Sequence, residues 1–316
     1  MHLTAYGGRN DSLFHAAIGE SNSFGQQLTI EESQYQYDNL TLATGCNTQS
    51  DTLSCLRGLS VQQLQQSDKA LPTPGGAGGK PVFMYSNVIE GPGGFTEDYM
   101  YNNLAAGKFV KVPTIFGGDS NEGTIFTPKT MNTQDDVNNF LKDNWVKLNS
   151  TQLSTIDNLY SWPLQPNATD LSFPSSFGKY WRVATNAYGE MRYNCPGVSL
   201  NTAFSSAGQN TWHYWWDVLT QANSQNGNGV THTAEVSSVW GTSTGVEGDQ
   251  IGTIQGFWTS FIRTGDPGQA WVKFTGDQMG KYHFATDSSK DGMVGLDPGQ
   301  KGRCEYLRGI GGGLGM

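Results

Sequence analysis

Residues 110–126 read VKVPTIFGGDSNEGTIF, an apolar run followed at once by a glycine-rich turn that carries two acids. The apolar run predicts a buried strand over Phe109 to Phe116, because short continuous hydrophobic segments bounded by glycines are typical of strands covered on both faces. Glu122 stands on the turn that leaves this strand. A carboxylate fixed at the end of a sheet strand can orient an imidazole, so we interpret Glu122 as a candidate catalytic acid.

Two other interpretations of this turn remain open. Glu122 is equally compatible with an ordinary solvated turn carboxylate. The spacing Asp119-x-Asn121 resembles the start of a calcium loop, but Gly123 stands where the third ligand is needed, which weakens that interpretation.

The second candidate is His232, within GVTHTAE at residues 229–235, just after an Asn- and Gly-rich loop. Histidine is the usual general base near neutral pH, although a lone histidine more often has a structural role. His232-x-x-Glu235 also has the form of half a metal site, with no second half evident in the sequence. The remaining histidines are His2, His15, His213 and His283, of which His213 lies in an aromatic run typical of a packed core.

Composition excludes several classes of protein. The chain has 316 residues, a net charge of -9 and only 15% charged residues. No basic stripe is available to neutralise phosphates, so we expect no nucleic-acid partner. No run of about 18 apolar residues occurs, so we expect no membrane span. The length fits a single α/β domain with a sizeable core.

The four cysteines favour an oxidising compartment. Cys46 and Cys55 flank a short polar loop, and their spacing suits a local disulfide, whereas Cys195 and Cys304 pair only if the fold brings them together. Buried free thiols remain the alternative, and the absence of a Cys-x-x-Cys motif disfavours zinc.

Glycosylation motifs support the same compartment. Asn-x-Ser/Thr motifs begin at Asn10, Asn39, Asn149 and Asn167. Together with the even cysteine count and the low charge, they predict a secreted glycoprotein. The first residues, Met1 to Gly8, have neither a basic start nor an apolar run, so we expect the secretion signal to be missing from this chain.

Periodicity predicts strands that alternate with helices, hence an α/β fold with a mostly parallel sheet. Helices are expected at 2–6, 29–43, 95–106, 133–143, 151–160, 175–193 and 249–264, and strands at 13–18, 109–116 and 210–219, with residues 81–89 extended.

The two candidate segments resemble the acid and histidine blocks of the type-B carboxylesterase/lipase family, the cholinesterase-like α/β-hydrolases. Three further segments agree with that family in order and spacing: residues 5–21, after its nucleophile helix, the Cys46–Cys55 loop followed by Leu56-Arg57, and residues 257–267, its C-terminal helix and turn. The resemblance spans nearly the whole chain and implies that Glu122 and His232 are the acid and base of a catalytic triad. It implies a carboxylic-ester hydrolase acting on small-molecule or lipid esters, without a metal or organic cofactor.

One departure from the family pattern is large. No Gly-x-Ser-x-Gly turn precedes Glu122, where the order Ser…Asp/Glu…His requires the nucleophile. We therefore expect an incomplete α/β-hydrolase fold, in which residues 1–308 form the C-terminal portion of one domain and residues 309–316 a flexible tail. Such a chain would supply the acid and the histidine and be inactive alone.

Ser21 is the alternative nucleophile, because Gly19-Glu20-Ser21 copies the first half of the motif. Ser23 replaces its final glycine, and no upstream strand is available to supply oxyanion donors. The sharp turn that presents a nucleophilic serine, called the nucleophile elbow, is therefore incomplete at Ser21.

Two rival functions come from other classes. The first is a non-catalytic adhesion or binding module of the same fold. The second is a carbohydrate-active protein that uses paired carboxylates, for which Glu235 and Asp249 are the candidates.

Overall fold

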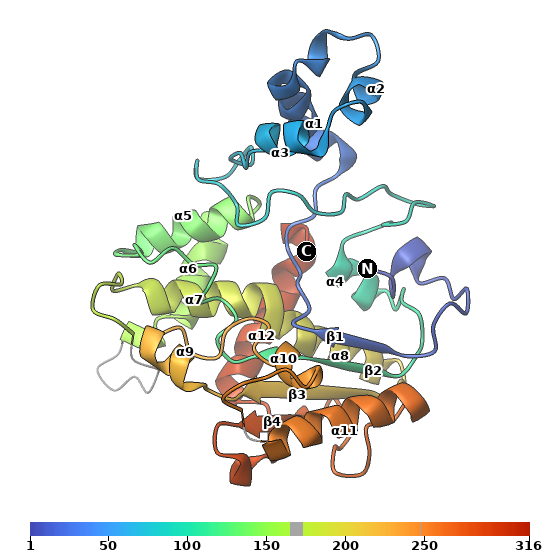
Figure 1. Cartoon of the computed structure of the whole chain (residues 1–316), viewed down its shortest axis with the longest axis vertical. Coiled ribbons are helices and arrows are strands. Elements are labelled where there is room, and N and C mark those ends of the chain that lie inside the picture. The colour runs from blue at the N-terminus through green and yellow to red at the C-terminus, as the bar shows by residue number, and fades with distance from the viewer. Residues whose placement is uncertain (165–172, 247) are drawn as a thin grey trace.

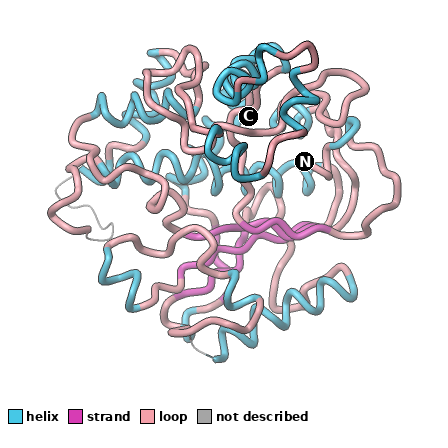
Figure 2. Tube along the Cα trace, turned by 45° about the horizontal axis from the view of Figure 1, so that its top comes forward, coloured by secondary structure: helices cyan, strands magenta, loops and turns pink. Residues whose placement is uncertain are grey.

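A five-stranded, mostly parallel sheet forms the centre of the protein. The computed structural model describes residues 1–164, 173–246 and 248–316. The strands follow one another across the sheet in chain order, and only the last is antiparallel to its neighbour (Figures 1 and 2). They are β1 (Ala17–Glu20), β2 (Thr114–Asp119), β3 (Thr211–Asp217), β4 (Gly280–Ala285) and β5 (Gly292–Gly295). Parallel pairing brings the carboxyl ends of β1 to β4 to the same edge of the sheet.

Helices cover both faces of this sheet. One face packs against helices α4, α7, α8 and α12 and the other against α11, so that side chains alternate between two separate cores along β3. Trp212, Tyr214 and Trp216 point into the α11 core, and each is at most 1% exposed. The covering helices are α4 (Met100–Ala105), α7 (Trp181–Gly189), α8 (Cys195–Ser206), α11 (Gly248–Thr264) and α12 (Pro298–Gly311).

Three helices stand away from this body at the top of Figure 1. They are α1 (Ile30–Thr44), α2 (Thr52–Arg57) and α3 (Val61–Ser67). The first begins with a capping box in which Thr29 and Glu32 bond each other's backbone N–H, as the sequence predicts. The disulfide Cys46–Cys55 ties α2 to the short turn that follows α1.

The remaining elements are short. They are the helices α5 (Gln134–Asn144), α6 (Ser150–Leu159), α9 (Gln221–Asn226) and α10 (Val236–Val239), and the 3₁₀ turns Ala5–Gly7, Cys46–Thr48, Trp162–Leu164, Ser288–Lys290 and Gly312–Leu314. In the part of the chain that the structure describes, no helix is both long and apolar enough to span a membrane.

Several predicted boundaries are wrong for an identifiable reason. The strand expected at 13–18 begins four residues later, and Leu13 is 84% exposed. The strand expected at 109–116 begins at Thr114, because Pro113 lacks the N–H that a ladder needs. Residues 2–6 and 95–106 contain only a 3₁₀ turn and the short α4. An apolar run in the sequence predicts which residues are buried. It does not predict where backbone pairing, and so the strand, begins.

The helix predicted to end at Tyr193 continues instead. Residues Glu190–Asn194 form a π-helical turn that joins α7 to α8. Pro196 lies in the first turn of α8, where its missing N–H is tolerated. The prolonged helix passes behind the turn that carries Glu122.

The flexible tail predicted at 309–316 is also wrong. These residues complete α12 and a 3₁₀ turn, and Leu314 and Met316 are only 1% and 2% exposed. The carbonyl of Met316 accepts from the N–H of Tyr101, and the N–H of Gln27 donates to the carbonyl of Gly315. The glycines that suggest mobility in the sequence instead permit this close packing.

A second disulfide joins Cys195 at the start of α8 to Cys304 in α12. The fold thus brings together the two cysteines whose pairing the sequence left open. This bridge closes a loop with a sequence separation of 109, against 9 for Cys46–Cys55.

We predict that the two disulfides contribute unequally to stability. The double variant Cys195→Ala/Cys304→Ala should lose about 2–5 kcal/mol of unfolding free energy, and about 2 kcal/mol more than Cys46→Ala/Cys55→Ala, because the longer loop restricts the unfolded chain more. Urea unfolding of both variants measures the difference. Equal losses, or the reverse order, would contradict the assignment.

Candidate active site

The buried carboxylate of Glu122 is the centre of the site. Its side chain is fully buried on the turn after β2. Oε1 accepts hydrogen bonds from the N–H of Asp119 at 2.8 Å and from Oγ of Ser21 at 2.7 Å. Oε2 lies 2.6 Å from Nδ1 of His232. Three contacts therefore fix both oxygens of a group that water does not reach.

His232 lies between this carboxylate and the surface. Its side chain is 22% exposed, and its ring packs 4.5 Å from the ring of Tyr193 and 5.3 Å from that of Phe126, measured between centroids. Because Nδ1 faces Glu122, the other ring nitrogen, Nε2, is left facing away from the acid. No described residue hydrogen-bonds Nε2, which leaves it available to accept a proton from a hydroxyl group.

Backbone contacts bring the two segments together although they lie 110 residues apart. Asn121 donates its N–H to the carbonyl of Val230 and accepts the N–H of Val230 on its side-chain oxygen. Asn194, in the π-helical turn, donates to the carbonyl of Asp119. The loop carrying His232 is thus bonded at Val230 to the turn carrying Glu122, and the π-helical turn is bonded to the end of β2.

Two glycines allow this turn to lie directly against the helix behind it. A Cβ on Gly123 would collide with the carbonyl of Thr185 in α7, and one on Gly189 would come within 2.9 Å of the N–H of Gly123. Both positions therefore require glycine for close approach. The sequence shows Gly123 but not the reason for it, since its partner lies on another helix.

Ser21 contacts the acid and not the base. It follows β1 with a φ of 51°, a left-handed conformation that is uncommon for a residue with a side chain. Its hydroxyl donates to Glu122, so it lies on the opposite carboxylate oxygen from His232. This arrangement supports a positioning role and provides no base to activate Ser21 as a nucleophile.

One Gly-x-Ser-x-Gly match occurs in the chain, at residues 241–245, after His232. It lies in the loop between α10 and α11, and a short helix precedes it. A nucleophile elbow requires a strand, a sharp turn and then a helix, so Ser243 lacks the necessary context.

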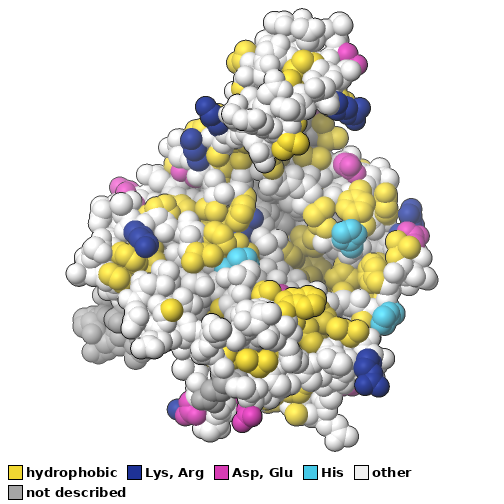
Figure 3. Space-filling model, viewed as in Figure 1, with side chains coloured by type: hydrophobic (Ala, Val, Ile, Leu, Met, Phe, Trp, Pro, Cys, Tyr) yellow, Lys and Arg dark blue, Asp and Glu magenta, His cyan; other side chains and the backbone are white. Residues whose placement is uncertain are grey.

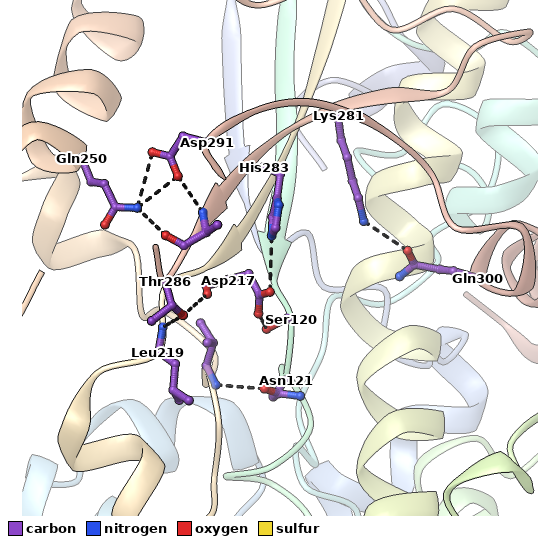
Figure 4. Close-up of polar contacts among 12 residues, drawn as sticks. Ser120, Asn121, Asp217, Leu219, Gln250, Lys281, His283, Thr286, Asp291 and Gln300 are labelled. Carbon is purple, nitrogen blue, oxygen red and sulfur yellow. Dashed lines mark hydrogen bonds and ion pairs between the residues drawn. The ribbon is translucent and has the colours of Figure 1, made fainter. Parts of the chain in front are cut away.

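A second group of serine, acid and histidine lies near the carboxyl ends of β3 and β4 (Figure 4). Ser120 donates to Oδ1 of Asp217 at 2.5 Å, and Nε2 of His283 lies 3.3 Å from Oδ2 of the same residue. The carboxylate separates the serine from the imidazole, so His283 is not positioned to take the serine proton.

The contacts in the structure do not support most of the other sites that the sequence suggests. Asn121 bonds the backbone of Val230, and the side chain of Asp119 accepts the N–H of Ala234, so these residues do not converge as calcium ligands. Glu235 is fully buried and bonded by Tyr214 at 2.6 Å, so a sugar substrate cannot reach it. His213 is buried in the core, and this burial lowers its pKa to about 3.

The surface is hollowed between the projecting helices and the sheet, and hydrophobic side chains gather around the hollow (Figure 3). A cavity of about 350 Å³ lies next to Ser21 and is lined in part by Phe24, Phe83, Leu200 and Phe204. Arg192, whose guanidinium lies 4.5 Å from the ring of Phe83, contributes its positive charge.

A family model, described as the carboxylesterase family, matches residues 1–297. The chain belongs to the carboxylesterase family. The matched range includes Glu122 and His232, and it also includes the segment from β1 to α11 that positions them.

Two known proteins resemble the chain over nearly its whole length, and a third resembles it over less than half. It is 26% identical to secreted lipase 4 of Gibberella zeae over 96% of this chain and 56% of that protein. It is 32% identical to lipase 2 of Geotrichum candidum over 41% of this chain and 24% of that protein. The crystal structure of Aspergillus niger EstA matches with a TM-score of 0.88 and 26% identity, over 100% of this chain and 62% of that one. The chain thus spans a little over half the length of the two proteins that it matches throughout.

We predict that Ser21→Ala destabilises this carboxylesterase-family chain by about 1–3 kcal/mol, because buried Glu122 loses one of the two donors to Oε1. Ser243→Ala, in an irregular loop, should stay within about 0.5 kcal/mol of the wild type. Chemical unfolding of both variants tests the difference. A loss no larger for Ser21→Ala than for Ser243→Ala would show that this hydrogen bond does not hold the acid.

Proposed function

We propose that this chain provides the acid and the base of a serine carboxylic-ester hydrolase. The observation that carries the proposal is the contact of 2.6 Å between Oε2 of Glu122 and Nδ1 of His232, with Nε2 directed away from the acid. An imidazole held in this way by a buried carboxylate is the arrangement that activates a hydroxyl nucleophile.

In the proposed reaction, Nε2 of His232 takes the proton of a serine hydroxyl as its oxygen attacks the ester carbonyl. The imidazolium then gives this proton to the leaving alcohol, and an acyl-serine remains. A water molecule attacks the acyl group in the same way, which releases the carboxylic acid and restores the serine. Glu122 holds the imidazole in the Nδ1–H tautomer and stabilises its cation without taking the proton, and no cofactor takes part.

We further propose that the attacking serine lies outside these 316 residues. Ser21 bonds the acid, and Ser243 lacks the strand and turn of an elbow. The chain spans 56% of secreted lipase 4 and 62% of EstA, which leaves room in those relatives for further catalytic residues. On this proposal the described residues form part of one α/β-hydrolase domain, and the chain alone is inactive.

The proposed substrates are esters with an apolar part, lipid esters included. Relatives named as lipases and the apolar lining of the cavity beside Ser21 support this class. We also propose a secreted glycoprotein, since three relatives are named secreted lipases. Of the predicted glycosylation sites, Asn10, Asn39 and Asn149 are exposed, and Asn167 lies outside the described residues.

The non-catalytic adhesion module is less well supported. A binding module has no need for a carboxylate and an imidazole held in hydrogen-bonding contact inside a fold, and the lipase names among the relatives favour hydrolysis.

The experiment uses a longer polypeptide in which a segment carrying Gly-x-Ser-x-Gly precedes these 316 residues. Hydrolysis of p-nitrophenyl butyrate should fall about 10³–10⁴-fold in His232→Ala and in Glu122→Gln, because either change removes the activated base. Asp249→Asn is the matched control: this acid is exposed on α11, and the variant should retain full turnover. Turnover that survives His232→Ala would contradict the proposal, and an equal loss in Asp249→Asn would show that the effect is not specific to the Glu122–His232 pair.

The chain of 316 residues alone provides the complementary measurement. It should show no turnover above background, and a fluorophosphonate probe should label none of its serines. Labelling of Ser21 or Ser243, abolished by His232→Ala, would identify a nucleophile within the chain and overturn that part of the proposal.

A further inference from the structure

Two buried carboxyl groups lie behind the proposed catalytic pair, and no cationic side chain of the described residues forms an ion pair with them. Asp119 is the last residue of β2, Glu235 follows His232 by three positions, and both side chains are 0% exposed. None of the ion pairs among the described residues involves either acid. Burial of two unpaired carboxylates in contact is strongly unfavourable.

Each acid has one oxygen with an ordinary donor. Oδ2 of Asp119 accepts the N–H of Ala234 at 3.3 Å, and Oε1 of Glu235 accepts the hydroxyl of Tyr214 at 2.6 Å. The other two oxygens, Oδ1 of Asp119 and Oε2 of Glu235, are buried and receive no donor from another side chain or from the backbone of the described residues. The N–H of Ala234, the residue before Glu235, bonds Asp119, and the two carboxyl groups perturb each other's protonation. Two acceptors that face each other in a buried site form a hydrogen bond only if one of them carries a proton.

We propose that Asp119 and Glu235 share one proton in the folded chain, and that this proton fastens the loop carrying His232 to the strand carrying Glu122. The geometry explains why this contact acts on the catalytic pair. Asp119 precedes Glu122 by three residues, and its backbone N–H donates a hydrogen bond to the Glu122 carboxylate. Ala234 and Glu235 follow His232 by two and three residues, and the N–H of Ala234 donates to Asp119. Both acids are thus positioning residues that contact no substrate.

The surroundings favour retention of the proton. The titratable groups that act on the pair are Glu122 on the turn and Tyr214 on β3. Behind them, Glu20 at the end of β1 acts on Tyr214, and His232 bonds Glu122. Glu20 itself is bonded by the indole N–H of Trp258 in α11. Burial, together with neighbouring negative charge, raises the pKa of Asp119 well above its usual range, and burial raises the pKa of Glu235 to about 7.

The sign of the resulting pH effect follows from linkage. In the unfolded chain both acids lose their protons near pH 4. In the folded chain burial raises the pKa of both acids, that of Glu235 to about 7, so above about pH 4 the folded state binds more protons than the unfolded chain. Stability from the pair is therefore complete below about pH 4 and is lost as the pH rises through about 7.

The first experiment compares unfolding of the wild-type chain and Glu235→Gln between pH 5 and 7. In the variant the amide oxygen can accept from Tyr214 and the amide N–H₂ can donate to Asp119, so no shared proton is needed. The folding constant of the wild type should fall about tenfold per pH unit relative to the variant, which corresponds to one proton. Glu31→Gln, an exposed acid at the start of α1, is the matched control and should keep the wild-type slope.

A second measurement uses the wild type directly. Its infrared spectrum at pH 6 should contain the carbonyl band of a protonated carboxyl group, and this band should disappear in Asp119→Asn and in Glu235→Gln. Absence of the band in the wild type, or equal pH slopes in wild type and Glu235→Gln, would overturn the proposal. If one variant fails to fold, the other variant and the wild-type band still decide the result.

The positioning role has its own readout. Hydrogen exchange at the N–H of Ala234 should accelerate at least tenfold in Glu235→Ala, which removes the contact, and stay slow in Glu235→Gln, which restores it. Equal exchange rates at Ala234 in the two variants would contradict the positioning role of the pair. None of these measurements requires turnover, so their outcome is independent of whether the proposed ester hydrolysis is correct.

Discussion

The site depends on one buried carboxylate whose two oxygens have different tasks. Oε1 of Glu122 is held by Ser21 and by the N–H of Asp119, and Oε2 is thereby left to bind Nδ1 of His232. A buried carboxylate is tolerated only where donors surround it, so these contacts are a condition for the fold as well as for the catalytic role proposed for Glu122. Because the acid cannot rotate, the imidazole has one orientation, with Nε2 toward the surface.

The rest of the fold makes this contact possible between residues that are far apart in the chain. Parallel pairing of β1 and β2 places Ser21 beside the turn of Glu122, and the N–H of Ser21 bonds the carbonyl of Gly117. The π-helical turn after α7 brings Tyr193 against His232 and Asn194 against the backbone of Asp119. Gly123 and Gly189 allow these layers to touch.

Prediction from the sequence succeeds where a pattern is local. The capping box at Thr29, the aromatic strand around Trp212 and the amphipathic helix ending at Thr264 all follow from spacing. The family resemblance singles out Glu122 and His232, which the structure brings into contact. Prediction fails where a distant partner decides the structure. The contact of Ser21 with Glu122, the ordered C-terminal residues and the Asp119–Glu235 pair depend on segments about 100 or more residues away. No window of the sequence contains that information.

The most direct test of the central claim is the tautomer of His232 in the folded chain, measured by ¹⁵N NMR of histidine-labelled protein at neutral pH. Hydrogen bonding of Nδ1 to Glu122 predicts a protonated Nδ1 and an unprotonated Nε2, the form that can take a proton from a hydroxyl group. The same tautomer should be lost or mixed in Glu122→Gln. A wild-type spectrum with the proton on Nε2, or one that is unchanged in Glu122→Gln, would contradict this account.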